Sequence, residues 1–145
     1  MLAFSHAIAG AAIAAKTTGN PALGYFLALA SHPLLDLVPH WDFNSRHNGR
    51  SAAKTVIISL TDAAIGFIIG FTLFGDVVAP GVLLATMLIA QLPDWLEAPL
   101  HVFNWKFPPF STIKKIQHIL HWKLASPWGI LTQLIFLLFV ILFAK

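Results

Sequence analysis

The chain has 145 residues, of which 57% are hydrophobic and only 10% are charged, and its mean hydropathy is +0.76. A soluble domain carries about 25% charged residues, so this composition favours a protein whose solvent is partly lipid. Cysteine is absent, which excludes disulfides, thiolate nucleophiles and cysteine-ligated zinc. The net charge is +3, but the orientation of the protein in a membrane explains where the basic residues lie. We therefore expect no nucleic-acid partner. The length indicates a single domain, residues 1–145.

Five apolar stretches predict an all-α fold, a polytopic membrane helix bundle with about five transmembrane helices. They cover residues 2–15, 22–38, 52–74, 77–100 and 127–144. A helix needs about 20 residues to cross a bilayer. The last three stretches satisfy this, the second is marginal, and the first crosses only with little tilt or local thinning. The first could also be a secretory signal peptide, but it has no basic n-region and contains His6.

Residues 112–124 have a different pattern. Apolar residues recur at helical spacing from Ile113 to Leu120, opposite Lys114 and Lys115. This pattern predicts an amphipathic helix that lies at the membrane interface.

The basic residues predict the orientation. With five spans, the N-terminus and the loops 39–54 and 100–125 lie on one side, which then holds seven of the nine bases. The other side holds only Lys16 and Lys145. By the positive-inside rule, we expect a cytoplasmic N-terminus and an outside C-terminus.

Histidines and acidic residues follow the same asymmetry. Of the seven histidines and six acidic residues, only Asp76 falls on the outer side of this map. Ordinary loops would scatter such residues over both faces, so we interpret the concentration as a functional site. Its members are His6, His32, Asp36, His40, Asp42, His47, Asp62, Asp94, Glu97, His101, His118 and His121. We expect His47, like Asp76, to stay outside the centre of that site.

The second span carries the densest part of this site. His32 and Asp36 are four residues apart and share one helix face, while Pro33 between them predicts a kink. A charged residue within a span costs at least about 2.5–3.5 kcal/mol, so something must offset it. A His–Asp hydrogen bond that only ties helices together would do so. His40 and Asp42 bring the run to four potential ligands, which favours a metal site.

The remaining candidates lie in later segments. Asp62 is the deepest acid in the predicted spans, with only Lys54 as a basic residue nearby, so it either takes up a proton or meets a metal ion or a histidine. Asp94 follows Pro93 near the cytoplasmic end of the fourth span. The histidines at 118 and 121 are three residues apart and could equally be ordinary polar residues of the amphipathic helix.

Imidazole and carboxylate groups together are the ligand set of zinc, manganese or iron. We therefore predict a divalent metal ion, with zinc as the first choice and manganese or iron as alternatives. The candidate ligands exceed what one ion needs, which leaves room for ligand-orienting residues or a second ion. The predicted ligands are His6, His32, Asp36, Asp62, Asp94, His118 and His121. We assign proton transfer to His40 and Asp94.

Residues 31–42, Ser-His-Pro-Leu-Leu-Asp-Leu-Val-Pro-His-Trp-Asp, and residues 92–94, Leu-Pro-Asp, carry a resemblance. Together with an early histidine and a late histidine pair, these two motifs resemble those of the predicted membrane-bound metal-dependent hydrolases of bacteria and archaea. The resemblance implies a small helical bundle in a prokaryotic cytoplasmic (inner) membrane. It places functional residues at His6, His32, Asp36, His40, Asp42, Asp94, His118 and His121. The first run is also similar to a stretch of zinc-dependent phospholipases C, in which the Asp-to-His spacing is longer.

These observations predict a metal-dependent hydrolase that acts on a lipid or another membrane-accessible ester, with a phosphoester as the first choice. Membrane lipids are the expected partners, and Trp41, Trp95, Trp105 and Trp122 would anchor the site at headgroup depth. A metal-ion or proton transporter is the alternative, although the outer half of the spans has few polar residues to form a pathway. A scaffold with a structural metal is the third possibility. No Gly-x-Ser-x-Gly, P-loop or dinucleotide motif occurs, which argues against serine-hydrolase and nucleotide chemistry.

Overall fold

The computed structural model describes residues 1–42 and 51–145, and these form seven helices without a strand, which confirms the all-α prediction. Arg46, His47 and Arg50, which were assigned to a cytoplasmic loop, lie outside the described residues. The helices are α1 (Ala3–Lys16), α2 (Pro21–Asp36), α3 (Ala52–Phe74), α4 (Pro80–Ala90), α5 (Leu92–Val102), α6 (Phe110–Leu120) and α7 (Trp128–Ala144).

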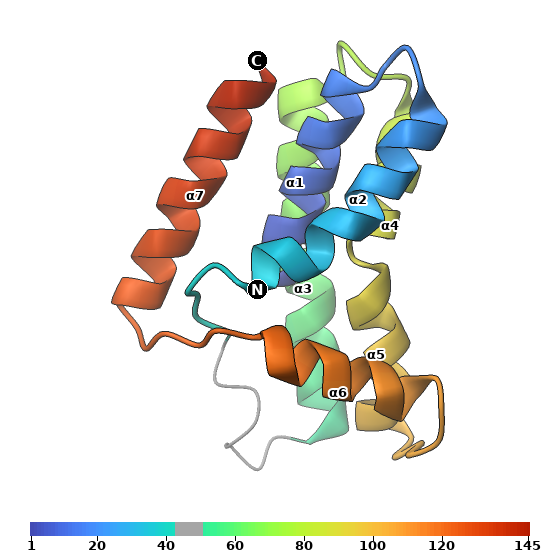
Figure 1. The fold of residues 1–145 in the computed structure, drawn as a ribbon, viewed down its shortest axis with the longest axis vertical. Helices are drawn as coiled ribbons and strands as arrows, with labels where there is room; N and C mark the ends of the chain where they lie inside the picture. The colour runs from blue at the N-terminus through green and yellow to red at the C-terminus, as the bar shows by residue number, and fades with distance from the viewer. Residues whose placement is uncertain (43–50) are drawn as a thin grey trace.

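The helices make five antiparallel passes through the bundle. In Figure 1, α1, α3 and α7 run upward, whereas α2 and the pair α4–α5 run downward. Helix α6 runs across the lower end. The five passes correspond in order to the five predicted apolar stretches.

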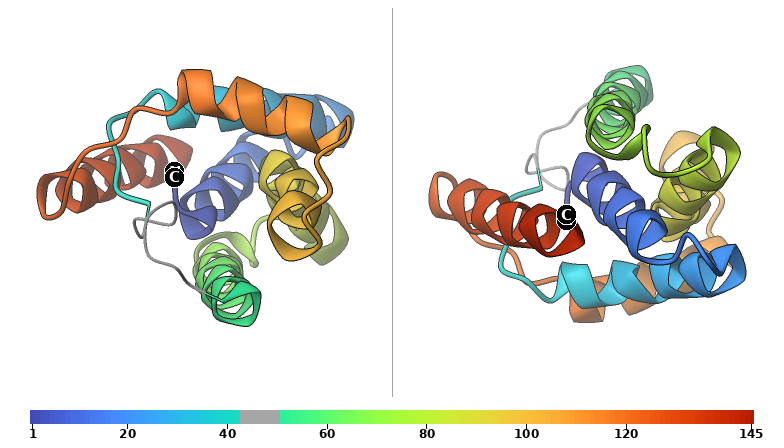
Figure 2. Two further views of the ribbon diagram at one scale, coloured as in Figure 1. Left: turned by 90° about the horizontal axis from the view of Figure 1, so that it is seen from below. Right: turned by 90° about the horizontal axis from the view of Figure 1, so that it is seen from above.

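Helix α1 lies in the middle of the bundle, where α2, α3, α4 and α7 all contact it (Figure 2). Its alanine and glycine residues explain this position, because small side chains let neighbouring helices approach closely. A Cβ at Gly10 would lie only 2.9 Å from the Cβ of Ala90. A Cβ at Gly66 of α3 would lie 2.6 Å from the Cα of Phe4. The first apolar stretch therefore forms the buried centre of the bundle.

The predicted fourth span, residues 77–100, is interrupted. Helix α4 ends at Ala90 and α5 begins at Leu92, with Gln91 between them at φ −96° and ψ −3°. Pro93 accounts for the break, because it has no N–H to donate to the carbonyl of Ile89. The interruption leaves the Ala90 carbonyl free for a side chain, and the functional site uses it.

Helix α6 ends at Leu120, four residues before the predicted end of the amphipathic helix. The chain beyond it is extended and pairs with the segment that follows α2. Trp122 N–H donates to the Asp36 carbonyl at 3.2 Å, His40 N–H to the Trp122 carbonyl at 3.1 Å, and Leu124 N–H to the His40 carbonyl at 2.8 Å. These long-range bonds replace the last helical turn and hold two loop segments side by side.

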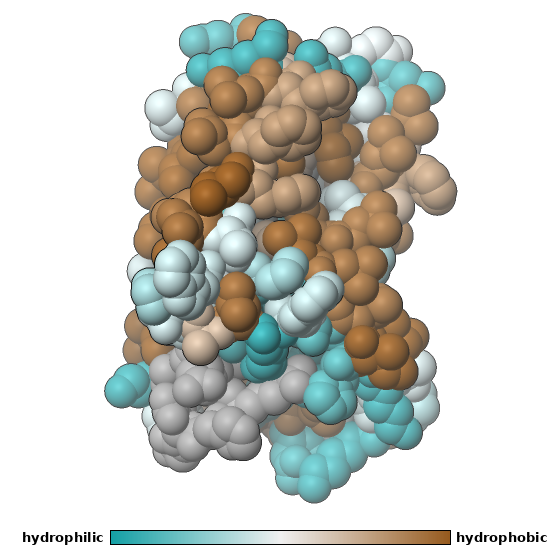
Figure 3. All heavy atoms as spheres, turned by 60° about the vertical axis from the view of Figure 1, so that its left-hand side comes forward, coloured by the Kyte–Doolittle hydropathy of each residue, from teal (hydrophilic) through white to brown (hydrophobic). Residues whose placement is uncertain are grey.

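Large apolar side chains cover much of the outer surface. Ile68 of α3 is 67% exposed and Phe139 of α7 is 65% exposed. On the face drawn in Figure 3, hydrophobic residues form a band between polar ends. Within the described residues, α3 alone is long and apolar enough to cross a membrane, and only 22% of its most apolar stretch is buried. Helices α4 and α7 are apolar but shorter, so five membrane crossings stay a prediction.

Candidate metal centre

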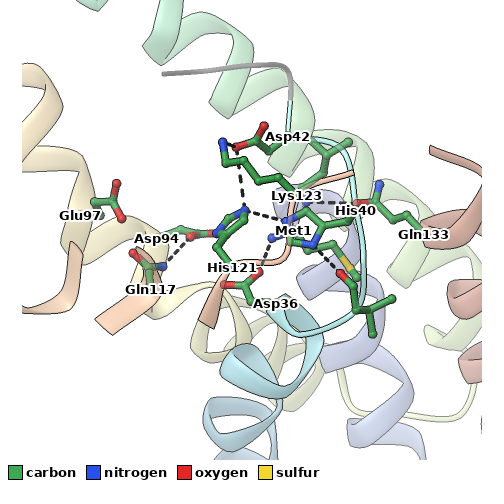
Figure 4. A network of polar contacts seen from close by, with 12 residues as sticks. Met1, Asp36, His40, Asp42, Asp94, Glu97, Gln117, His121, Lys123 and Gln133 are labelled. Carbon is green, nitrogen blue, oxygen red and sulfur yellow. Dashed lines mark hydrogen bonds and ion pairs between the residues drawn. The ribbon is translucent and has the colours of Figure 1, made fainter. Parts of the chain in front are cut away.

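Segments far apart in the sequence bring histidine and aspartate side chains together around Asp36. Helix α1 supplies His6, the last turns of α2 supply His32 and Asp36, and the two paired loop segments supply His40 and His121. Figure 4 shows the part of this network around Asp36 and His121. The convergence of five such groups defines the candidate metal centre.

His6, His32 and Asp36, the first group, could together hold a metal ion, because their potential ligand atoms all lie within 4.8 Å of one another. His6 Nε2 is 3.4 Å from Asp36 Oδ1, and His32 Nε2 is 3.6 Å from Asp36 Oδ2. The two imidazole rings stack with their centroids 3.9 Å apart. All three residues are buried. Two imidazoles and a carboxylate form a ligand set suited to zinc, manganese or iron.

His6 is fully buried, and neither of its ring nitrogens has a hydrogen-bond partner among the described residues. A buried polar group without a hydrogen bond costs free energy, and nearly all such groups in folded proteins have a partner. Asp36 Oδ1 is 3.4 Å from His6 Nε2 and lies against the amino group of Met1. An ion bound between His6 and Asp36 would give this nitrogen the partner that it lacks among the described residues.

The break between α4 and α5 orients His32. Its Nδ1 donates to the Ala90 carbonyl at 2.8 Å, so in the neutral ring Nε2 presents a lone pair. Metal-bound histidines commonly donate their other ring nitrogen to a carbonyl in this way. His32 Nε2 is 3.5 Å from Asp94 Oδ1, and the Gln117 amide nitrogen lies 3.2 Å from His32 Nε2 and 3.0 Å from Asp94 Oδ1.

Asp36, His40 and His121, the second group, also place their potential ligand atoms within 4.8 Å of one another. His40 Nε2 is 2.6 Å from His121 Nε2, while His40 Nδ1 donates to the Val38 carbonyl at 2.7 Å. Burial, together with the charge of the Met1 amino group, lowers the pKa of His121 to about 3 and also lowers the pKa of His40. Both imidazoles therefore stay neutral, which is the form that binds metal.

A pocket of about 170 Å³ opens beside the first group, between α2, α5 and α6. His32, Asp36 and Gln117 border it, but their polar atoms are covered, so the accessible wall is apolar and includes Pro33 and Ile113. A cavity of about 150 Å³ is large enough for benzene, so a small apolar group would fit. The pocket therefore suits the apolar part of a molecule that lies beside the first group.

Ion pairs fix the elements around the centre. Asp42 pairs with Lys123 and lies 3.9 Å from His121 Nε2. Glu97 of α5 pairs with Lys114 of α6 and is 2.5 Å from His101 Nε2. These contacts hold the segment after α6, and α6 itself, against the remainder of the bundle.

The structure distributes the predicted site residues unevenly. His6, His32 and Asp36 form the first group, and His121 joins the second group with His40, to which we had assigned proton transfer. Asp94 contacts the first group through His32.

Asp62 and His118 belong to neither group. Asp62 Oδ2 accepts the Ala3 N–H at 2.6 Å and so caps the beginning of α1. His118 is an exposed residue of α6, whereas His121, three residues later, leaves the helix for the extended segment. Asp76 is exposed between α3 and α4.

Gln117 is the site residue that sequence reasoning missed. It is 7% exposed, and its amide bridges His32 and Asp94. A signal for it exists in the sequence, because Gln117 is four residues after Ile113 and three before Leu120. It is a polar residue on the apolar face of an amphipathic helix, a position that usually marks a buried polar contact.

No protein-family model matches the chain, and neither does any curated protein or solved structure. The resemblance to predicted membrane-bound hydrolases therefore stands as a prediction from the motifs of the sequence.

Proposed function

We propose that this protein is a metal-dependent hydrolase of a prokaryotic cytoplasmic membrane, acting on a lipid or another membrane-accessible ester, with a phosphoester as the first choice. The observation that carries the proposal is the buried first group, in which neither ring nitrogen of His6 has a hydrogen-bond partner within the described part of the chain. Hydrolysis adds the oxygen of water to the phosphorus or carbonyl carbon, breaks the ester bond, and releases an alcohol that takes up a proton.

The outer surface and the distribution of charge support the membrane setting. Many large apolar side chains of α3 and α7 are exposed, and contiguous apolar surface marks a site of contact with a protein or a membrane. The candidate centre lies towards the end of the bundle that α6 crosses, with Lys106, Lys114 and Lys123 on or beside α6. The positive-inside rule then places this end at the cytoplasmic face, with membrane lipids as partners.

The donor set supports a divalent metal ion, with zinc as the first choice and manganese or iron as alternatives. When bound, such an ion lowers the pKa of a coordinated water towards neutrality. Among the chain's own groups, the Asp94 carboxylate is placed to take the proton that the attacking water loses. Its side chain is 36% exposed, and Gln117 donates to Oδ1, which leaves Oδ2 for that proton.

The position of the pocket supports an amphiphilic substrate. Its accessible wall is apolar and would receive the beginning of a hydrocarbon chain, while the ester group would have to reach the buried His32 and Asp36 beside it. Because the pocket borders α2 and α6, whose Leu34 and Ile116 are exposed, such a substrate could enter from the bilayer.

The test is elemental analysis of detergent-purified protein, with Asp36→Asn beside the matched control Asp76→Asn. We expect bound metal in the wild type and the control, and its loss in Asp36→Asn. A panel of phospholipids and soluble phosphoesters should then show turnover that depends on the same residue. A wild type that binds no divalent metal refutes the proposal. Metal flux into liposomes without turnover of any ester would establish the transporter instead.

A further inference from the structure

The geometry points to a two-metal centre in which Asp36 is the bridging ligand. His6 and His32 would hold one ion, and His40 and His121 the other. This inference rests on the proposed function and extends it, because it adds a second metal site and narrows the substrate class.

The first argument is the number and grouping of ligands. A catalytic zinc ion takes three protein ligands and keeps one position for water. Five buried or half-buried groups converge here, which is too many for one such ion. They divide into two sets of three, each with ligand atoms within 4.8 Å of one another, and the two sets share Asp36 alone. A carboxylate has two oxygens and can accept from both sides.

The second argument is the orientation of one histidine in each group. His32 Nδ1 donates to the Ala90 carbonyl at 2.8 Å, and His40 Nδ1 donates to the Val38 carbonyl at 2.7 Å. Both therefore direct an Nε2 lone pair inward. The two carbonyls come from unrelated elements, a helix break and a turn, so the shared orientation does not follow from a common local structure.

The third argument is the contact between His40 and His121. Their Nε2 atoms are 2.6 Å apart, which a single shared proton could explain. Two imidazoles on one tetrahedral zinc, with bonds of about 2.0–2.1 Å, have nitrogens about 3.3 Å apart. The rings need to separate by less than an ångström to hold an ion. The experiment must therefore distinguish a proton from a metal.

Each end of the centre also has its own additional carboxylate. Asp94 Oδ1 is 3.5 Å from His32 Nε2, and Asp42 Oδ2 is 3.9 Å from His121 Nε2. With Asp36 between them, three carboxylates accompany the four histidines. Asp36 lies against the Met1 amino group and Asp42 pairs with Lys123, so bound ions would take the place of these cations.

The substrate class follows from the pair of ions. Two-metal sites, with ions about 3.5–4 Å apart, are typical of enzymes that cleave phosphoesters, where the ions stabilise both the attacking and the leaving oxygen. We therefore assign a phosphoester of an amphiphile to this pocket rather than a carboxylic ester.

The experiment is zinc content per full-length chain in detergent, with the protein loaded with zinc alone. We expect about two ions in the wild type and about one in His121→Ala, whose side chain is only 14% exposed but lies in a loop rather than in a packed helix. The matched control His101→Ala, which lies in neither group, should keep both ions. Asp36→Asn should lose both.

A second measurement uses the manganese-loaded protein and needs no catalytic activity. Two ions that share a carboxylate give an exchange-coupled electron paramagnetic resonance spectrum, which His121→Ala should convert to that of isolated manganese. One ion in the wild type, retained in His121→Ala, would refute the second site and leave the proposed function standing. No ion in the wild type would refute both.

Discussion

The contact between α1 and α3 is close enough that one methyl group should disrupt the bundle. In Gly66→Ala the new Cβ would lie 2.6 Å from the Cα of Phe4, whereas ordinary contact begins at 3.4 Å, so the helices must separate by about 0.8 Å. The opposing atoms are the Cα and carbonyl oxygen of Phe4 and the Cβ of Ala7, none of which can rotate away. Overpacking of this kind costs about 1–3 kcal/mol. The same displacement would lengthen the bond from Ala3 N–H to Asp62, which caps α1.

Thermal unfolding in detergent measures this effect, and Gly81→Ala is the matched control. A Cβ at Gly81 meets no atom within 4 Å, and alanine is favoured over glycine in a helix by about 1 kcal/mol, so this variant should unfold at or above the wild-type temperature. Gly66→Ala should unfold well below it. It should also bind metal more weakly, because α1 carries His6. Equal unfolding temperatures for the two variants would refute the tight packing of α1 against α3.

Three further predictions concern the centre and one concerns topology. Asp62→Ala should lose about 0.5–2 kcal/mol of stability with the loss of a helix cap, yet keep its metal content; loss of metal would instead make Asp62 a ligand. Gln117→Leu should weaken metal binding roughly 10–100-fold in competition with a chelator, and unchanged affinity would argue against an orienting role. His118→Ala should keep the wild-type metal content, since the structure places it outside both groups. In this cysteine-free chain, Thr18→Cys and Phe107→Cys should react with an impermeant thiol reagent from opposite sides of the membrane, and labelling from one side would contradict the five-span topology.

Local spacing predicted the parts of the centre that one helix supplies. His32 and Asp36 share a face because they are four residues apart, and the helix through Pro33 preserves that relation. Apolar stretches likewise predicted most of the helices, and Pro93, which has no N–H to donate, stands where α4 and α5 separate. Each of these features depends on residues within a few turns of one another.

Tertiary contacts determined which of the other candidate residues belong to the centre. Asp62 and Asp36 are both acids within apolar stretches, and what separates their roles is which segment lies beside them. The beginning of α1 faces Asp62 and offers a backbone N–H, whereas histidines face Asp36. In the same way, His121 reaches His40 only because α6 ends early and the segment after it pairs with the segment after α2. No pattern in the neighbouring sequence predicts these hydrogen bonds.

The central position of α1 also governs the order in which the protein can be assembled. Helix α1 is synthesised first, but three of its neighbours, α3, α4 and α7, are synthesised after the α1–α2 hairpin. Its last face is covered only when α7, which ends at Ala144, has been inserted. The second group is equally late, since His121 is translated long after His40. A nascent chain therefore carries His6 and Asp36 through most of its synthesis before all of their final neighbours exist. A chain truncated before Trp128 would leave the alanine-rich helix α1 exposed on the side where α7 packs.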